Sequence, residues 1–433
     1  MMRLNRYIVS AIGLATAVFL PLKAQDTPEE KLNMTMYAIM NMYVDTVDKA
    51  SFVDDMIART VRTLDPFSAY LTPEEARANE EALLGPTASG MASDPASGKT
   101  VQTAYMADAG TGYIRLTMFS ESSPEEFRLT VERLKKQGMK NLILDIQGNP
   151  GGFMDSAIAI ADELLGGSRT IVTTSGAHIP TESACTQTDG CFETGRVVLL
   201  TNGQTMSAAE ILAGALRDWD RAVIVGSTTF GKGLIQETLP FKDGSALRLT
   251  VARYLTPCGM TIQKPYEGYG KVFADTAGTF RSLANGRLLK SSGGIEADVH
   301  VPRDTVFMTQ WYYNVSFNGM QKAEVSSYLR KNGDMLKKKY RNPDAYFRKF
   351  AGEDEMFMEL TDMAAASGLP FDQEECDRSA YAIKTQLKAL LARELYPDDP
   401  DIYYKILNTA NPAVVKALEV LSGDEYDRIL GIK

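Results

Sequence analysis

The chain has little of what metal-dependent and histidine-dependent catalysis requires. It holds only two histidines, His178 and His300, and four cysteines among 433 residues. The cysteines have no metal-ligand spacing and no HExxH sequence is present, so we expect no metal site. The scarcity of histidine also leaves few general bases for a nucleophilic side chain.

An excess of positive charge is missing too. The formal net charge is −9, from 46 Lys and Arg against 55 Asp and Glu. This balance argues against a nucleic-acid partner, which requires a basic footprint. The lysine-bearing phosphate loop and the spaced-glycine dinucleotide pattern are also absent, so we expect no cofactor.

Only one apolar run suggests a targeting segment. Ile8–Leu22 carries no charge and follows Arg3 and Arg6. It is shorter than the ~20 residues of a membrane span, and a small residue, Ala24, follows it. The pattern predicts a signal peptide over residues 1–24, cut near Ala24, with an uncleaved anchor as the alternative. We therefore expect an exported protein of the periplasm or cell envelope, and peripheral association with the envelope fits this location.

Export permits disulfides. Cys185 and Cys191 lie six positions apart across a segment that resembles a hairpin tip, which predicts a loop-closing disulfide. The alternative for each cysteine is a small buried apolar side chain. The spacing leaves open whether Cys258 pairs with Cys376.

Length and patterning indicate several structural units. A chain of 433 residues is too long for one ordinary core. Apolar residues at helical spacing predict an N-terminal helical region over 25–84, and a Gly/Ser/Pro-rich linker is expected at 85–110. Strands then alternate with helices over 111–305, and helical spacing returns over 306–433. We expect an α/β fold of the mixed α+β type, with a mixed sheet and flanking helical regions.

Ser207 and Lys232 are the residues that most restrict the chemistry. Ser207 follows an apolar strand pattern and opens a helix, while Lys232 lies between two glycines beyond the next strand pattern. A neutral lysine can replace imidazole as the base of a serine nucleophile. The lysine pKa must then fall from ~10.4, which requires burial. The alternatives are a serine that only caps a helix and a surface lysine in a glycine turn.

Two further segments complete a candidate site. Gly151 follows a buried strand pattern, where a glycine N–H could join that of Ala208 in an oxyanion hole. The alternative is a tight strand–helix turn. Gln236, four positions after Lys232, would face it if this stretch is helical or turned. No GxSxG sequence surrounds Ser207, so an ordinary α/β-hydrolase is not expected.

Several segments together resemble one family. In chain order they are Leu64–Leu71, Thr111–Arg115, Leu142–Gly152, Ser207–Ile211, Gly231–Gln236 and Gly293–Asp298. They are similar to the C-terminal processing peptidases, the tail-specific serine proteases of the S41 type, from about residue 30 to 305. The resemblance implies Ser207 as nucleophile, Lys232 as general base and Gln236 as the residue that holds the lysine. It also implies oxyanion donors at Ala208 and near Gly151, and protein or peptide substrates.

The chain departs from this family in one interval. Members usually carry a PDZ domain between the Leu64–Leu71 motif and the strand at Tyr113. Leu83–Gly112 is too short for an independent domain of about 50 residues or more. We therefore expect a serine endopeptidase that lacks the PDZ domain and is either ungated or takes its substrate through another surface or a partner. The region after 306 is a candidate for that role. The alternative is an inactive peptide-binding or scaffold protein, and a homo-oligomer fits either reading.

Overall fold

The computed structural model describes residues 27–84, 99–266, 279–290, 293–302 and 304–432. The predicted signal peptide and most of the predicted linker lie outside these residues. The chain divides into two compact units, Met1–Thr60 and Val61–Lys433, which are described separately.

The first unit holds α1 (Pro28–Met42) and nearly all of α2 (Lys49–Val61). Thr27 and Glu30 form a reciprocal capping box, which satisfies backbone donors that a helix start leaves open. None of the residues of α1 is buried. Tyr37 is 67% exposed and Met42 74%. The helical prediction for this region is confirmed, and α1 leaves its apolar side chains uncovered by the described chain.

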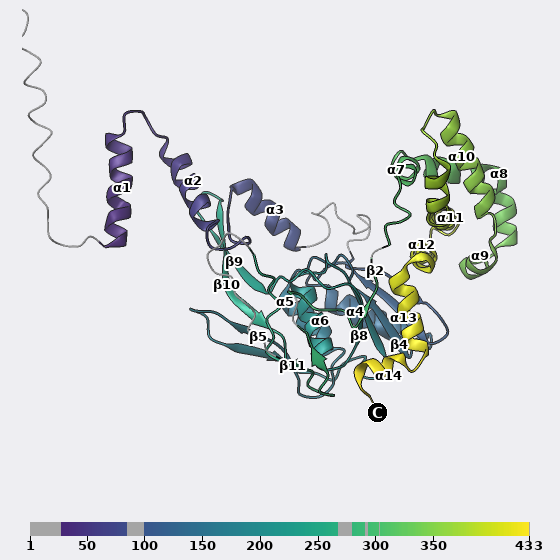
Figure 1. The fold of residues 1–433 in the computed structure, drawn as a ribbon, viewed down its shortest axis with the longest axis horizontal. Helices are drawn as coiled ribbons and strands as arrows, with labels where there is room; N and C mark the ends of the chain where they lie inside the picture. The colour runs from purple at the N-terminus through teal and green to yellow at the C-terminus, as the bar shows by residue number, and fades with distance from the viewer. Residues whose placement is uncertain (1–26, 85–98, 267–278, 291–292, 303, 433) are drawn as a thin grey trace, which may run out of the picture. The chain divides into compact units, whose positions relative to one another are not determined.

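The second unit contains the other described elements (Figure 1). Its strands are β1 (Ala69–Leu71), β2 (Val101–Met106), β3 (Thr111–Leu116), β4 (Asn141–Asp145), β5 (Thr170–Ser175), β6 (Glu182–Cys185), β7 (Val197–Thr201), β8 (Val223–Gly226), β9 (Leu234–Pro240), β10 (Ala246–Leu255), β11 (Phe280–Arg281), β12 (Leu288–Leu289) and β13 (Val299–His300). Its helices are α3 (Pro73–Leu84), α4 (Ser123–Lys136), α5 (Met154–Asp162), α6 (Ala208–Asp218), α7 (Gln310–Phe317), α8 (Met320–Lys339), α9 (Pro343–Lys349), α10 (Glu353–Ala366), α11 (Gln373–Leu395), α12 (Asp401–Leu407), α13 (Pro412–Ser422) and α14 (Glu425–Leu430).

A six-stranded sheet in the order β13-β8-β7-β4-β3-β2 forms the centre of this unit. Its strands pair in parallel except β2, which is antiparallel to β3. Successive side chains of β4 point to opposite faces. Leu142 and Leu144 pack in the same cluster as α4, α5 and α6, while Ile143 packs with α13 and α14. Burial on both faces explains why these strands are continuous apolar runs. The predicted mixed α/β fold is confirmed.

The last two helices cover one face of this sheet. Val414, Val420 and Leu430 lie in a buried cluster with side chains of β3, β4, β7 and β8. Arg196, just before β7, donates to the carbonyl oxygens of Leu421 and Gly423 and pairs with Asp427, while Tyr426 Oη accepts a hydrogen bond from Val197 N. The predicted C-terminal region, 306–433, therefore contains helices that belong to the core of the sheet.

A second, antiparallel sheet is organised around β10. Its first residues pair with β1, its last residues with β5, and β9 runs along its other edge, with β6 beyond β5. The sequence pattern did not predict β2: Val101–Met106 pairs with β3, so the expected linker ends well before residue 110.

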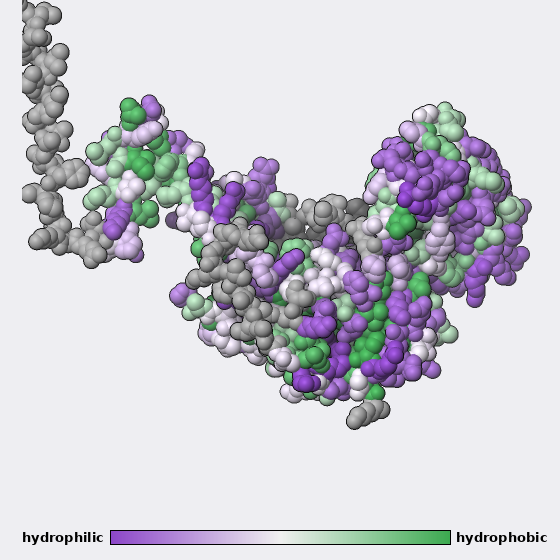
Figure 2. Space-filling model, in the orientation of Figure 1, coloured by the Kyte–Doolittle hydropathy of each residue, from purple (hydrophilic) through white to green (hydrophobic). Residues whose placement is uncertain are grey.

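Helices α7 to α12 share a separate core that includes Trp311, Tyr346 and Ile383. The visible surface of these helices is mainly hydrophilic (Figure 2). Asp401 joins this region to the sheet, because its carboxylate accepts hydrogen bonds from Thr103 Oγ1 and Ala104 N of β2. None of the described helices is long and apolar enough to cross a membrane.

The packing of α13 against the six-stranded sheet can be tested by substitution. Val420 is fully buried against the sheet, whereas Val415 on the same helix is 41% exposed. Val420→Asp would bury an unpaired carboxylate, so we expect a loss of about 3 kcal/mol or more in the free energy of unfolding. Val415→Asp is the matched control and should change it by less than about 0.5 kcal/mol. Urea unfolding of both variants measures the difference, and equal losses would show that α13 does not cover the sheet.

Candidate active site

Ser207 occupies the sharp connection between β7 and α6. Its backbone dihedrals are φ 58° and ψ −123°. A residue other than glycine in such a conformation costs about 1–3 kcal/mol and persists only where the surroundings enforce it. The N–H groups of the first turn of α6 follow at once. The sequence therefore forms a strained serine turn at a helix start although the GxSxG sequence is absent.

Gly151 lies directly against this turn. Its φ is +100°, and a Cβ added there would come within 2.8 Å of Ser207 Cβ and 3.0 Å of Ala208 N. A larger residue at this position would displace the serine turn, so glycine is required by close approach. The Gly151 N–H donates to Asn149 Oδ1 at 2.8 Å. Because this donor is already engaged, the oxyanion role of Gly151 stays a prediction.

Glu210, on the first turn of α6, links the serine segment to the lysine segment. Its carboxylate is fully buried. Oε2 accepts from the backbone N–H of Ser207 at 3.0 Å and of Lys232 at 2.8 Å. Oε1 accepts from Gly231 N at 2.7 Å and from the Thr229 hydroxyl. Burial raises the pKa of Glu210, and these hydrogen bonds act in the opposite direction by favouring the ionised form.

Tyr254 of β10 makes a second link between the same two segments. Its hydroxyl lies 2.7 Å from Lys232 O and 3.1 Å from Ser207 O, within hydrogen-bonding distance of both. Its side chain is 1% exposed, and burial raises its pKa well above the usual value, so the hydroxyl stays protonated and remains a donor. The backbones of residues 207 and 232 are thus joined through Glu210 and through Tyr254.

The environment of Lys232 favours the neutral amine. Burial lowers its pKa, and the nearby Arg248 lowers it further, while Glu210 and Asp65 act in the opposite direction. Its Nζ lies 5.2 Å from the centre of the Phe67 ring. Among the described contacts, no hydrogen bond joins Lys232 Nζ to Ser207 Oγ, so the direct contact between them stays a prediction.

A tight loop before β1 places Phe67 beside the lysine. Asp65 Oδ1 accepts from Phe67 N and Ser68 N at 2.8 Å each, and its other oxygen accepts from the Ser68 hydroxyl. Arg248 Nε donates to Phe67 O, and Thr250 N donates to Ser68 Oγ. These bonds attach the loop to β10, which gives the Leu64–Leu71 motif a physical role as one wall of the site.

Gln236 lies on β9, so the helical or turned geometry considered for it does not form. Its side-chain Nε2 donates to Thr250 Oγ1 at 3.2 Å, and the two residues are register partners of β9 and β10. Lys232 precedes the strand and shares no regular face with Gln236. The role of Gln236 as the residue that holds the lysine stays a prediction.

The four cysteines are free thiols in the structure. Cys185 ends β6, and burial raises the pKa of Cys191 to about 12. The predicted disulfide between Cys185 and Cys191 stays a prediction, and Cys258 and Cys376 are likewise unpaired. The described residues contain no group of three or more His, Cys, Asp or Glu side chains able to hold a metal ion.

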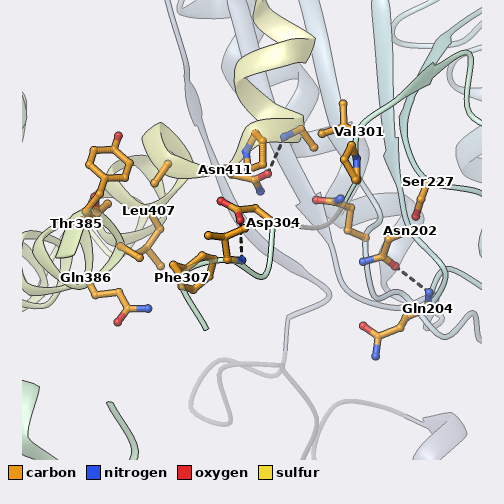
Figure 3. Close-up of a pocket in the computed structure, with 18 of the residues that line it drawn as sticks. Asn202, Gln204, Ser227, Val301, Asp304, Phe307, Thr385, Gln386, Leu407 and Asn411 are labelled. Carbon is orange, nitrogen blue, oxygen red and sulfur yellow. Dashed lines mark hydrogen bonds between the residues drawn. The ribbon is translucent and has the colours of Figure 1, made fainter. Parts of the chain in front are cut away.

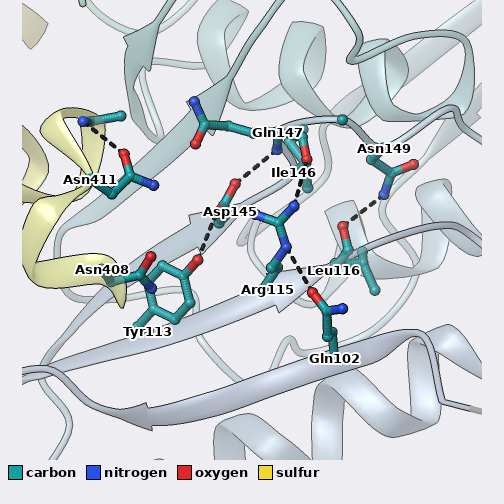
Figure 4. Close-up of polar contacts among 12 residues, drawn as sticks. Gln102, Tyr113, Arg115, Leu116, Asp145, Ile146, Gln147, Asn149, Asn408 and Asn411 are labelled. Carbon is teal, nitrogen blue, oxygen red and sulfur yellow. Dashed lines mark hydrogen bonds and ion pairs between the residues drawn. The ribbon is translucent and has the colours of Figure 1, made fainter. Parts of the chain in front are cut away.

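A partly buried ion pair between Arg115 and Asp145 supports the loop that carries Gly151 (Figure 4). Asp145, at the end of β4, accepts from Tyr113 Oη at 2.6 Å and from Arg115 Nη1 at 2.8 Å. Asp145 also accepts from Gln147 N at 2.8 Å, and Arg115 Nη2 donates to Gln147 O. The start of the 146–151 loop is therefore fixed at Gln147, whose backbone N–H and carbonyl oxygen are both hydrogen bonded.

Sequence reasoning missed the roles of Glu210, Tyr254 and Asp65. Glu210 gave a detectable signal, because a Glu three residues after a helix-capping serine is the capping-box pattern. Its Oε2 does accept from Ser207 N, but the same carboxylate also reaches a loop more than twenty residues away. Tyr254 gave no local signal, since only the fold brings β10 to the start of α6.

Replacing Glu210 should damage both stability and the serine turn. Glu210→Ala leaves four donors without an acceptor in a buried site, so we expect a loss of about 3–5 kcal/mol in the free energy of unfolding. Glu210→Gln keeps one acceptor oxygen but sets an NH₂ group against N–H donors, and it should slow labelling of Ser207 by a serine-directed probe. The exposed Glu237 supplies the control Glu237→Gln. Wild-type labelling and stability in Glu210→Gln would contradict this account.

Comparison with known proteins finds similarity in two segments of the chain. Residues 110–269 match Peptidase family S41, and residues 311–398 match a family of unknown function, DUF8443. The carboxy-terminal processing protease CtpA of Bacillus subtilis (strain 168) is 37% identical over 166 residues, which cover 38% of this chain and 35% of that protein. The carboxyl-terminal-processing protease of Synechocystis sp. (strain ATCC 27184 / PCC 6803 / Kazusa) is 43% identical over 153 residues, 35% of each chain.

One solved structure can be set beside these relatives. The photosystem II D1 C-terminal processing protease has a TM-score of 0.45 and 21% identity, and the match covers 65% of this chain and 95% of that one. In sequence, the chain spans about a third of the length of the curated relatives it matches. Residues 110–269, which carry Gly151, Ser207 and Lys232, are therefore a domain of Peptidase family S41.

Proposed function

We propose that this protein is an exported serine endopeptidase that hydrolyses peptide bonds with Ser207 as nucleophile and Lys232 as general base. The observation that carries the proposal is the shared carboxylate of Glu210, which binds the backbone N–H of both residues. A serine that opens a helix and a half-buried lysine are each common alone. Their connection through one buried acceptor supports a single catalytic site.

In the proposed reaction, the neutral Lys232 amine takes the hydroxyl proton of Ser207 as Oγ attacks the carbonyl carbon of the substrate. The resulting ammonium then gives a proton to the leaving amine, and the C–N bond breaks. Water attacks the acyl-enzyme ester with Lys232 again as base, which releases the acid and restores the serine. Burial of the lysine supports this role because it lowers the free energy of the neutral amine relative to the ammonium.

The oxyanion of each tetrahedral intermediate would be stabilised by backbone donors near Ser207. Ala208 N–H lies at the start of α6, where the helix dipole favours negative charge. A glycine N–H near Gly151 would be the second donor. If it is Gly151 itself, the Asn149 amide must release that N–H when substrate binds, because the two are hydrogen bonded in this structure. Gln236 is proposed to orient Lys232.

The proposed substrates are proteins or peptides. The relatives' names describe processing at the carboxyl terminus, and we extend this to a preference for the carboxyl-terminal part of substrate chains. Export follows from the signal-peptide pattern in residues 1–24 and places the activity in the periplasm or cell envelope. The absence of a PDZ domain from the interval Leu83–Gly112 remains part of this proposal.

The first test is cleavage of an unfolded protein by the wild type, Ser207→Ala and Lys232→Ala. We expect the wild type to cleave and both variants to lose at least about a thousandfold in kcat/KM, because they remove the nucleophile or its base. A wild type that neither cleaves nor reacts with a serine-directed probe would favour a peptide-binding protein without activity. Cleavage retained by Lys232→Ala would remove the lysine from the mechanism.

The pH dependence tests the base separately. Only the neutral amine accepts a proton, so kcat/KM should rise with pH and level off above the pKa of Lys232, below the usual value of ~10.4. Arg248 lowers this pKa, so Arg248→Gln should raise it and move the profile to higher pH. Lys242→Gln removes an equal charge from an exposed position and should leave the profile in place. A flat wild-type profile, or no movement in Arg248→Gln, would contradict the assignment.

A further inference from the structure

A cavity lies at the carboxyl ends of the parallel strands, on the side where the C-terminal helices approach the sheet (Figure 3). Its volume is about 540 Å³. One wall carries Asn202 and Ser227, which follow β7 and β8, and the other carries residues of α11 and α12, among them Thr385 and Leu407. Ligands of open α/β sheets bind outside the carboxyl ends of the strands.

The lining suits a peptide better than a highly charged ligand. Side-chain amides, including Gln147, Asn202 and Gln204, alternate with apolar groups such as Phe307. An amide offers donors and an acceptor together, which matches the alternating C=O and N–H groups of an extended backbone. Within the described residues, the amide groups of Gln147 and Gln204 make no side-chain hydrogen bond in this structure, so both are available to a ligand.

The charged residues of the cavity favour the carboxyl-terminal end of such a peptide. Among the described lining residues only Asp304 and Arg378 are charged. Asp304 accepts a hydrogen bond from Val306 N within its own turn. Arg378, exposed on α11, has no ion pair with the described chain. A guanidinium group binds a carboxylate through two parallel hydrogen bonds, which a single backbone amide cannot match.

The cavity is connected through the chain to the candidate active site. Three loops follow β4, β7 and β8, and each begins in the cavity, at Gln147, Asn202 and Ser227. The same loops carry Gly151, Ser207 and Lys232 at or near their other ends, where α5, α6 and β9 begin.

Hydrogen bonds tie the first two of these loops together. Gly148 N donates to Asn202 Oδ1, Thr205 Oγ1 donates to Ile146 O, and Met206 N donates to Asn149 O. A ligand in the cavity would therefore contact the starts of the loops whose other ends carry the residues of the candidate active site.

We propose that this cavity binds the carboxyl-terminal segment of the polypeptide substrate, with its free carboxylate on Arg378 and its backbone on the amides of Gln147 and Gln204. The inference rests on the proposed peptidase function. It assigns capture of the carboxylate to Arg378, which lies in the region that matches a family of unknown function. The capture surface and the catalytic residues then share the same three loops.

The test measures binding without cleavage. The full-length Ser207→Ala protein is titrated with a dye-labelled apolar peptide of Ala, Leu and Val that has a free carboxylate, and with the same peptide as a carboxamide. Fluorescence anisotropy reports affinity. We expect the free carboxylate to bind about tenfold more tightly. Adding Arg378→Gln should remove this difference, whereas Arg330→Gln, an exposed arginine of α8 outside the cavity, should keep it.

Equal affinity for the two peptides, or a difference that survives Arg378→Gln, would overturn the inference. The cleavage assay separates this result from failure of the proposed function. If the wild type cleaves, Arg378→Gln should raise KM for substrates with a free carboxyl terminus and leave kcat unchanged. Unaltered KM would reject the cavity while the peptidase stands. Carboxylate-dependent binding by a chain that never cleaves would retain the cavity and reject the peptidase.

Discussion

The carboxylate of Glu210 is the interaction on which the candidate site depends. It takes one hydrogen bond from the serine turn and three from the lysine loop, counting the Thr229 hydroxyl. A buried charge is tolerated only where its hydrogen-bonding capacity is filled. The loop around Lys232 therefore cannot move away from Ser207 without leaving this carboxylate unsatisfied. The hydrogen bonds that compensate for burial of the Glu210 carboxylate therefore also stabilise the strained backbone conformation of Ser207.

The parallel sheet determines where this arrangement can form. Parallel strands bring their carboxyl ends to one edge, so the loops after β4, β7 and β8 meet although they are distant in sequence. Each loop contributes residues to two sites. The start of the loop lines the candidate cavity, and its far end carries a residue of the candidate active site. The antiparallel sheet adds the remaining wall, because β10 carries Tyr254 and also attaches the loop that holds Phe67.

Patterns within one segment were predictable from the sequence, and contacts between segments were not. Asn141–Asp145 and Val197–Thr201 were recognisable as buried strands because parallel strands are apolar on both faces. Ser207, Lys232 and Gly151 stood out because each follows a strand pattern and because the segments around them resemble one family. Val101–Met106 was not recognisable, since its pairing partner supplies its stability. Gln236 was considered in a helical geometry, and only the register with Thr250 shows that it lies in a strand.

The cover of the sheet has a consequence for how the protein is made. Tyr113, Ile143 and Val225 are buried by residues between Ala413 and Leu430, far along the chain. During synthesis the strands leave the ribosome first, and their apolar face stays open until α14 has followed. A chain that stops before residue 412 leaves this apolar face uncovered, which weakens the sheet that supports the loops carrying Ser207 and Lys232. We therefore expect the candidate site to reach its full geometry only after residues 412–430 have been made.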